Sequence, residues 1–131
     1  MRPSPRMHPH DLRLLRPTLQ QDAINAAFQA TDGDGNPLYA VKASGLRCSC
    51  QPAGVRVADL YAAEQVVVDT SVFTTDPLDK ARVGDVMEVT SPTGRVTFVR
   101  WEGRVDQGGR GNVFRHDGRT LQRPTDDDDD E

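Results

Sequence analysis

The chain has 131 residues, the size of one domain, and a domain of this length can bury a core without metals or disulfides. The formal net charge of -4 hides a segregation, because six of the 20 acids form the run at residues 126–131. The rest of the chain has 14 acids against 16 bases and lacks the dense Lys/Arg run of a duplex-DNA reader. No apolar run approaches the ~20 residues of a membrane span, which excludes membrane insertion as a helix.

The two ends of the chain differ in composition from the middle. The start, MRPSPRMHPHDLR, is charged, and Pro3, Pro5 and Pro9 prevent regular backbone pairing, so we expect residues 1–11 to be a flexible arm. It has no apolar stretch for secretion, so we expect the protein in the cytosol or in a particle assembled there. Residues 124–131 contain no apolar side chain and are predicted to be a disordered acidic tail. Residues 12–123 are then a single domain.

The first part of that domain alternates extended and polar stretches. LRLLRPT (residues 12–18) is typical of a strand, and LYAVKA (residues 38–43) is extended again. Between them, QQDAINAAFQA (residues 20–30) would place Ile24, Ala27 and Phe28 on one face of a short helix.

The stretch TDGDGNP (residues 31–37) resembles the start of an EF-hand calcium loop. With Asp32 in the first position, the sixth position is Pro37 instead of glycine, and the twelfth is Ala43 instead of glutamate. With Ala30 in the first position, the twelfth is Val41. Both registers fail, so we interpret the stretch as a turn and expect no metal there.

The body of the chain, from residue 46 to about 118, is a series of short strands and turns. LRCSC (46–50) predicts a strand ended by Pro52, residues 57–65 a short helix, and VVVDTSVFTT (66–75) the clearest strand. GDVMEVT (84–90) and RVTFVRWEG (95–103) form a hairpin around the turn SPTG, and NVFRH (112–116) closes the set after the glycine-rich loop DQGGRG. This order predicts an all-β fold, a small β-barrel with one long inter-strand loop or short helix.

RVTFVRWEG carries apolar groups on both faces. Val96 and Phe98 lie on one face, and Val99 and Trp101 on the other, whereas a barrel core needs only one of them. The second apolar face indicates an oligomer, and we take Val99 and Trp101 as the candidate subunit interface.

No catalytic or cofactor site is evident. A zinc site from Cys48, Cys50, His8, His10 and His116 would lack the two separated ligand pairs that structural zinc uses, so we expect simple thiols. The chain has no G-x-S-x-G, and DQGGRG lacks the Lys-Ser/Thr of a phosphate loop. We therefore expect no enzyme and no cofactor.

Single-stranded nucleic-acid binding is an alternative function, because small barrels bind single strands through surface aromatics and a basic groove. The candidate residues are Trp101, Arg100, Arg104, Arg110 and Arg115.

The body also resembles a known family. In CSCQPAGVRVADLYAAEQVVVDTSVFTTDPLDKARVGDVMEVTSPTGRVTFVRWEGRVDQGGRGNVF the relevant features are Gln51-Pro52 after a strand, the Ala- and Tyr-containing stretch at 57–65, and the strand that follows it. Asp76-Pro77, Gly84-Asp85, Gly94 and the strand ending in Gly103 complete the order. In this order, over residues 12–118, the chain resembles the head-closure proteins of long-tailed bacteriophages, also called head-to-tail stoppers or head-tail joining proteins.

The resemblance implies a structural virion protein of the phage neck, assembled in the host cytoplasm as a sixfold homo-oligomeric ring. Its partners would be adaptor or portal proteins, the tail terminator or tail tube, and packaged double-stranded DNA. A long loop points into the channel in that family, and the corresponding segment here is residues 51–65, with candidate channel residues Gln51, Arg56, Asp59, Tyr61, Glu64 and Gln65. Its mixed charge favours a steric plug over a phosphate clamp, and a neighbouring tier, adaptor or tail-completion protein, is an alternative within the same class.

Overall fold

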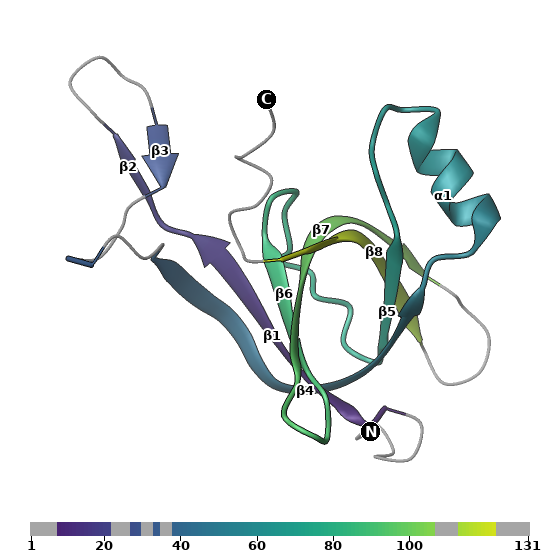
Figure 1. Cartoon of the computed structure of the whole chain (residues 1–131), viewed down its shortest axis with the longest axis horizontal. Coiled ribbons are helices and arrows are strands. Elements are labelled where there is room, and N and C mark those ends of the chain that lie inside the picture. Colours follow the sequence, from purple (N-terminus) through teal and green to yellow (C-terminus); the bar gives the residue numbers. More distant parts are fainter. Residues whose placement is uncertain (1–7, 22–26, 30–32, 35–37, 107–112, 123–131) are drawn as a thin grey trace.

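The protein is a closed antiparallel β-barrel with one short helix, as the sequence predicts (Figure 1). The computed structural model describes residues 8–21, 27–29, 33–34, 38–106 and 113–122. Around the barrel the strands follow the order β1-β4-β5-β8-β7-β6. Their bounds are β1 His10–Pro17, β4 Tyr39–Pro52, β5 Thr70–Thr74, β6 Val86–Thr90, β7 Val96–Asp106 and β8 Phe114–Leu121, with helix α1 at Val55–Ala62.

β4 is one 14-residue strand where the sequence indicates two. It pairs with β1 over its first ten residues and with β5 from Cys48 to Pro52, so it bends from one neighbour to the next. Two register shifts against β1 and the positive φ of Gly45 (70°) accommodate the bend. A bulge increases local twist, which a strand shared by two parts of a small barrel requires.

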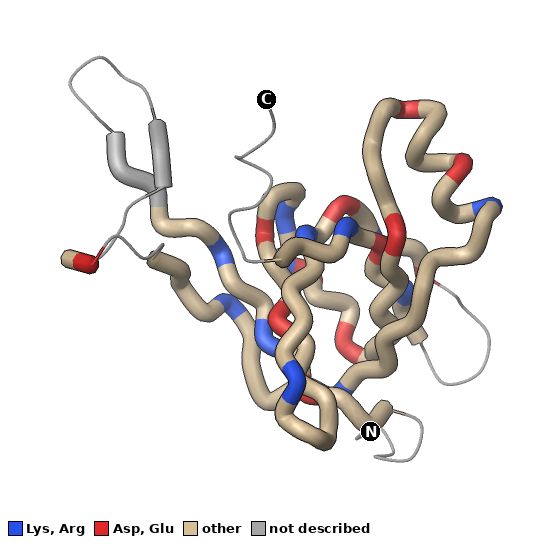
Figure 2. The backbone as a smooth tube through the Cα atoms, viewed as in Figure 1, with Lys and Arg blue, Asp and Glu red and all other residues tan. Residues whose placement is uncertain are grey.

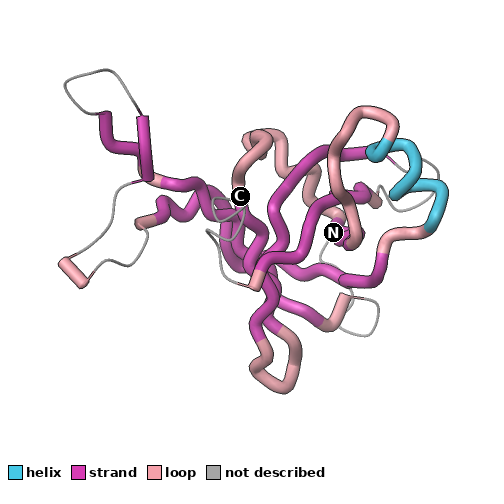
Figure 3. The backbone as a smooth tube through the Cα atoms, turned by 45° about the horizontal axis from the view of Figure 1, so that its top comes forward, coloured by secondary structure: helices cyan, strands magenta, loops and turns pink. Residues whose placement is uncertain are grey.

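The helix predicted for residues 20–30 is wrong in its described parts. Leu19–Gln21 form β2, Ala27–Gln29 form β3, and the two pair antiparallel as a separate two-stranded sheet (Figure 3). The apolar period over this stretch was weak, and extended pairing continues the β1–β4 ribbon, where the Thr18 amide donates to the Leu38 carbonyl at 2.9 Å.

The predicted hairpin is confirmed as β6 and β7. Its turn at residues 91–94 is closed by the Ser91 amide donating to the Arg95 carbonyl at 2.8 Å. Gly94 has a φ of 91°, a conformation that favours glycine. β5 is shorter than predicted, because residues 66–69 precede it without strand pairing, although Val68 is buried.

The barrel interior is filled by apolar side chains from five strands and the β5–β6 loop. They are Leu12, Leu14, Cys48, Val72, Leu78, Met87, Val89 and Val99. A second, smaller cluster of Leu15, Val86 and Leu121 packs with Tyr39 and Phe98. Because residues two apart on a strand share a face, Leu15, Val86 and Phe98 lie on the outer side of the sheet whose inner side carries Leu14, Met87 and Val99.

This arrangement corrects the assignment of Val99 and Trp101 as a subunit interface. Val99 is fully buried in the interior, and Trp101 packs against the same inner cluster. The face of β7 that remains on the outer side of the barrel is the one with Val96 and Phe98. The pairing register of β7 with β6 decides which set lies inside, because Val99 is opposite the buried Met87 and Phe98 is opposite the half-buried Glu88.

The boundary of the N-terminal arm also moves. His8 is buried, and Arg47 donates to the carbonyl oxygens of His8 (3.1 Å) and Pro9 (3.2 Å), so residues 8–11 belong to the barrel. The remaining arm, the acidic tail at 124–131, the rest of the TDGDGNP stretch around Gly33 and Asp34, and the loop at 107–112 lie outside the described residues. Among the described helices none has the length and apolar character to cross a membrane.

Candidate functional site: the helical segment between β4 and β5

The segment that the resemblance assigns to a channel is a closed loop on one side of the barrel. Its two ends are held together, since Pro52 pairs with Thr70 across β4 and β5 and the Ala53 amide donates to the Asp69 carbonyl at 3.0 Å. Between these points residues 53–69 leave the barrel, form α1 and return (Figure 1). The predicted short helix is therefore confirmed, beginning two residues earlier than expected.

Local sequence ends α1 with a defined cap. The Val66 amide donates to the Tyr61 carbonyl and the Gln65 amide to the Ala62 carbonyl, both at 2.9 Å, and Gln65 has a φ of 63°. These two bonds with a left-handed residue between them make a Schellman motif, in which Gln65 occupies the position that usually holds glycine. At the other end Gly54 supplies no side-chain cap. The helix therefore depends on tertiary contacts for much of its stability.

Tyr61 makes the main tertiary contact of α1. Its hydroxyl donates to Oδ2 of Asp117 on β8 at 3.0 Å, and its ring lies over Gly103 of β7. A Cβ added at Gly103 would lie 2.6 Å from the Tyr61 hydroxyl oxygen, so a side chain there would displace this hydroxyl from its present position. Burial, with the charge of Asp117 and the bond to it, raises the pKa of Tyr61 to about 12.

Asp117 is a buried carboxylate with its partners in place. Ser71 donates to Oδ1 at 2.9 Å, and Nε of Arg115 lies 2.9 and 3.1 Å from the two oxygens. A fully buried charge is stable only when it is paired and hydrogen-bonded, which Tyr61, Ser71 and Arg115 together achieve. No sequence pattern indicates this anchor, because its four residues come from three elements, α1, β5 and β8, that are far apart along the chain.

We expect Tyr61→Phe to loosen α1 without opening the barrel. Asp117 keeps Ser71 and Arg115, and losing one hydrogen bond to a charged group should cost about 1.5–3 kcal/mol. Hydrogen exchange should speed up at the α1 amides while the β6–β7 ladder stays protected. Asp59→Asn, on the exposed side of the same helix, is the matched control and should change neither. If Tyr61→Phe left α1 exchange at the parent rate, Tyr61 would not be the anchor.

The other candidate channel residues lie differently from Tyr61. Gln51, Arg56, Asp59, Glu64 and Gln65 are exposed, and none of the helix residues is buried. Tyr61 itself points to the barrel, so the structure corrects its role from channel residue to anchor. The exposed side of the segment carries the apolar Val55, Leu60 and Val67, at 78%, 68% and 62% exposure.

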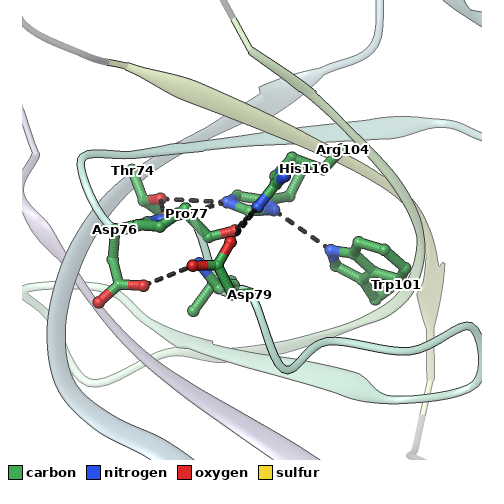
Figure 4. A network of polar contacts seen from close by, with 8 residues as sticks. Thr74, Asp76, Pro77, Asp79, Trp101, Arg104 and His116 are labelled. Atoms are coloured by element: carbon green, nitrogen blue, oxygen red, sulfur yellow. Dashed lines mark hydrogen bonds and ion pairs between the residues drawn. The ribbon is translucent and has the colours of Figure 1, made fainter.

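A second polar cluster is centred on His116, the residue that precedes Asp117 on β8 (Figure 4). The indole Nε1–H of Trp101 donates to Nδ1 of His116 at 3.2 Å. Since an indole can only donate, Nδ1 is the acceptor, and the ring proton resides on Nε2, 3.1 Å from Oγ1 of Thr74. The Thr74 hydroxyl in turn donates to the Asp76 carbonyl.

This geometry gives His116 a packing role. It is fully buried, and burial is the main cause that lowers its pKa to about 4. The charge of Arg104 also lowers the pKa, whereas the bond to the Asp76 backbone and the charges of Asp117 and Asp76 raise it by less. Arg104 ties the neighbouring loop down by donating to the Pro77 carbonyl (2.9 Å) and to Asp79 (2.7 Å). The chain of bonds fixes the loop that inserts Leu78 into the core.

The two cysteines are free thiols, as expected. Cys48 is fully buried in the core and Cys50 half-buried beside it. Burial, then the charges of Cys50 and Asp11, raises the pKa of Cys48 to about 12, which makes it a poor nucleophile. Within the part of the chain that the structure describes, no three His, Cys, Asp or Glu side chains are grouped to hold a metal ion.

The residues of the nucleic-acid alternative do not form an open basic groove. Trp101 packs inward, and each described arginine of the set has an acidic partner. The pairs are Arg100–Glu102, Arg104–Asp79 and Arg115–Asp117. Arg110 lies outside the described residues.

Comparisons with known proteins add no relative. No protein-family profile matches the sequence, and a search of curated proteins found no match either.

Proposed function

We propose that the protein is a structural connector of the phage neck, a ring-forming stopper that joins the portal-adaptor complex to the tail and helps to retain packaged DNA. The proposal is supported by the resemblance over residues 12–118 together with the small barrel. The observation that carries it is the segment at residues 53–69, which leaves the barrel, exposes most of its surface and is fastened through Tyr61.

Such a segment could close a channel simply by occupying space in it. Its ends meet at the Pro52–Thr70 pair, so it can project from the barrel without breaking the strand ladder. Several copies in a ring would bring several such loops around one channel and narrow it. Because residues 53–69 contain Arg56 against Asp59, Glu64 and Asp69, the loop would obstruct DNA sterically and would not grip its phosphates.

The test removes the loop and keeps the barrel. Replacing residues 56–63 with a Gly-Ser bridge should leave the barrel folded, because β4 and β5 keep their pairing. Heads completed with the shortened protein should incorporate it and leak DNA, measured as nuclease sensitivity of the packaged genome. Ala63→Ser, an exposed change that keeps the loop length, is the control and should protect DNA like the parent. Equal protection by the shortened protein at normal incorporation would remove the plug and leave a joining role.

A binding assay separates this function from the nucleic-acid alternative. A connector that meets DNA only sterically should not be retained on single-stranded DNA at moderate salt. Salt-dependent retention would instead indicate phosphate contacts and favour the alternative.

A further inference from the structure

Two exposed faces on different sides of the barrel match each other in apolar surface and oppose each other in charge. The first, which we call the helix face, comprises Val55, Leu60 and Val67 with the charged residues of the same segment. The second, which we call the strand face, is the outer side of β4, β1, β6 and β7, where Val41 and Val96 are 50% and 44% exposed beside half-buried Phe98.

The register places the strand-face residues together. Val41 pairs with Leu15, Leu15 with Val86, and Glu88 with Phe98, so these side chains point to one side across four strands. Val96 lies two residues before Phe98 on β7, so its side chain points to the same side. The buried outer cluster of Leu15, Val86 and Leu121 packs against Phe98 and so holds this surface in place.

The charges of the two faces are complementary. The helix face has three acids, Asp59, Glu64 and Asp69, against Arg56. The strand face has four bases on or beside it, Arg13, Lys42, Arg47 and Arg95, against two acids, Asp11 and Glu88. Arg13 pairs with Glu88 and Arg47 with Asp11, so the face keeps a basic excess. Figure 2 shows the acidic segment at α1 and the basic positions along the β1–β4 ribbon on the other side of the molecule.

The barrel order sets the faces apart. α1 is fastened to β8 at Asp117 and to the C-terminal part of β7 at Gly103. The strand face is centred on β6 and β1 and includes only the N-terminal part of β7, with Val96 and Phe98. In the order β1-β4-β5-β8-β7-β6, β5 and β6 are three strands apart, directly across the barrel. One molecule cannot bring its own two faces together, but two molecules can.

We propose that the helix face of one copy binds the strand face of the next, head to tail. The inference rests on the proposed function, which needs self-association, and adds which surfaces make the contact. Two identical helix faces would bring like charges together, as would two strand faces, so the charge pattern favours the head-to-tail contact over a symmetric dimer. Repetition of such a contact closes into a ring when the rotation between copies permits.

Single-face variants test the contact. Leu60→Asp on the helix face and Val96→Asp on the strand face should each weaken self-association of the purified protein by at least about tenfold in sedimentation velocity. Val83→Asp is the matched control, because Val83 is 62% exposed on the β5–β6 loop and belongs to neither face. Circular dichroism should show all three folded. Raising the salt concentration should weaken the parent contact by screening its charges.

Mixing the two variants gives the decisive result. A Leu60→Asp copy keeps an intact strand face and a Val96→Asp copy an intact helix face, so the mixture should form one-to-one dimers that grow no further. A mixture that stays monomeric, a variant that assembles like the parent, or a parent that is monomeric at about 0.5 mM would overturn the inference, since a specific interface holds well below that concentration. Failure of this contact and failure of the proposed function are distinguishable, because nuclease protection of completed heads measures the function whichever surfaces join the copies.

Discussion

Gly118→Ala should lower the free energy of unfolding by at least about 3 kcal/mol, because overpacking here meets backbone that cannot move aside. A Cβ at Gly118 would lie 2.2 Å from the Arg100 carbonyl oxygen and 2.6 Å from Cγ1 of Val99. Gly118 pairs with Trp101 of β7 and with Thr70 of β5, so ladders on both sides fix its position. The midpoint of urea denaturation measures the loss.

The control for this change is Gly33→Ala. A Cβ at Gly33 meets nothing within 4 Å, so the denaturation midpoint should stay close to that of the parent. A Gly118→Ala protein with the parent's midpoint would mean that β7 and β8 do not approach as closely as the structure has them, and the packing of Trp101 against the core would have to be revised.

Acid should destabilise the barrel through His116. Its folded pKa of about 4 lies below the ordinary value of 6.5, because burial disfavours the charged ring. Above pH 6.5 both the folded and unfolded chains hold the ring neutral, so this contribution is fully present. Between pH 6.5 and pH 4 only the unfolded chain binds the proton, so stability falls with pH by up to ~3 kcal/mol.

His116→Gln isolates this effect from other titrating groups. The variant should be less stable at pH 7, since the bonds from Trp101 and to Thr74 are disturbed, but its unfolding free energy should change less between pH 6.5 and pH 4. Urea denaturation of both proteins at several pH values gives the comparison. Parallel pH profiles for parent and variant would show that His116 takes up a proton in the folded barrel and is not the buried neutral ring described here.

The position of the candidate site in the chain could be predicted from the sequence, but the contacts that hold its helix on the barrel could not. Residues 51–65 stand out because Pro52 ends a strand and a helical period follows, and both signals are local. The anchor consists of Tyr61, Gly103 and Asp117, which are 42 and 14 residues apart in order along the chain. Nothing in the neighbourhood of any one of them indicates the other two. Tyr61 therefore looked like one more residue of the loop.

The elements that form within a few residues could be predicted from the backbone preferences of those residues. Pro92 and Gly94 set the β6–β7 turn, and β-branched residues favour β5, so these elements follow from backbone preference alone. Residues 19–21 and 27–29 did not form the predicted helix, because the helical period was weak and the two segments pair with each other as β2 and β3. Such pairing depends on two segments, so the sequence of either one does not reveal it. The orientation of β7 was likewise open, because both of its faces carry apolar groups. Closure of the barrel decided it: Val99 is buried and Trp101 packs against the same inner cluster as Met87 and Val89, while Val96 and Phe98 lie outside. The pairing register, which only the tertiary structure sets, determines which face of β7 is the inner one.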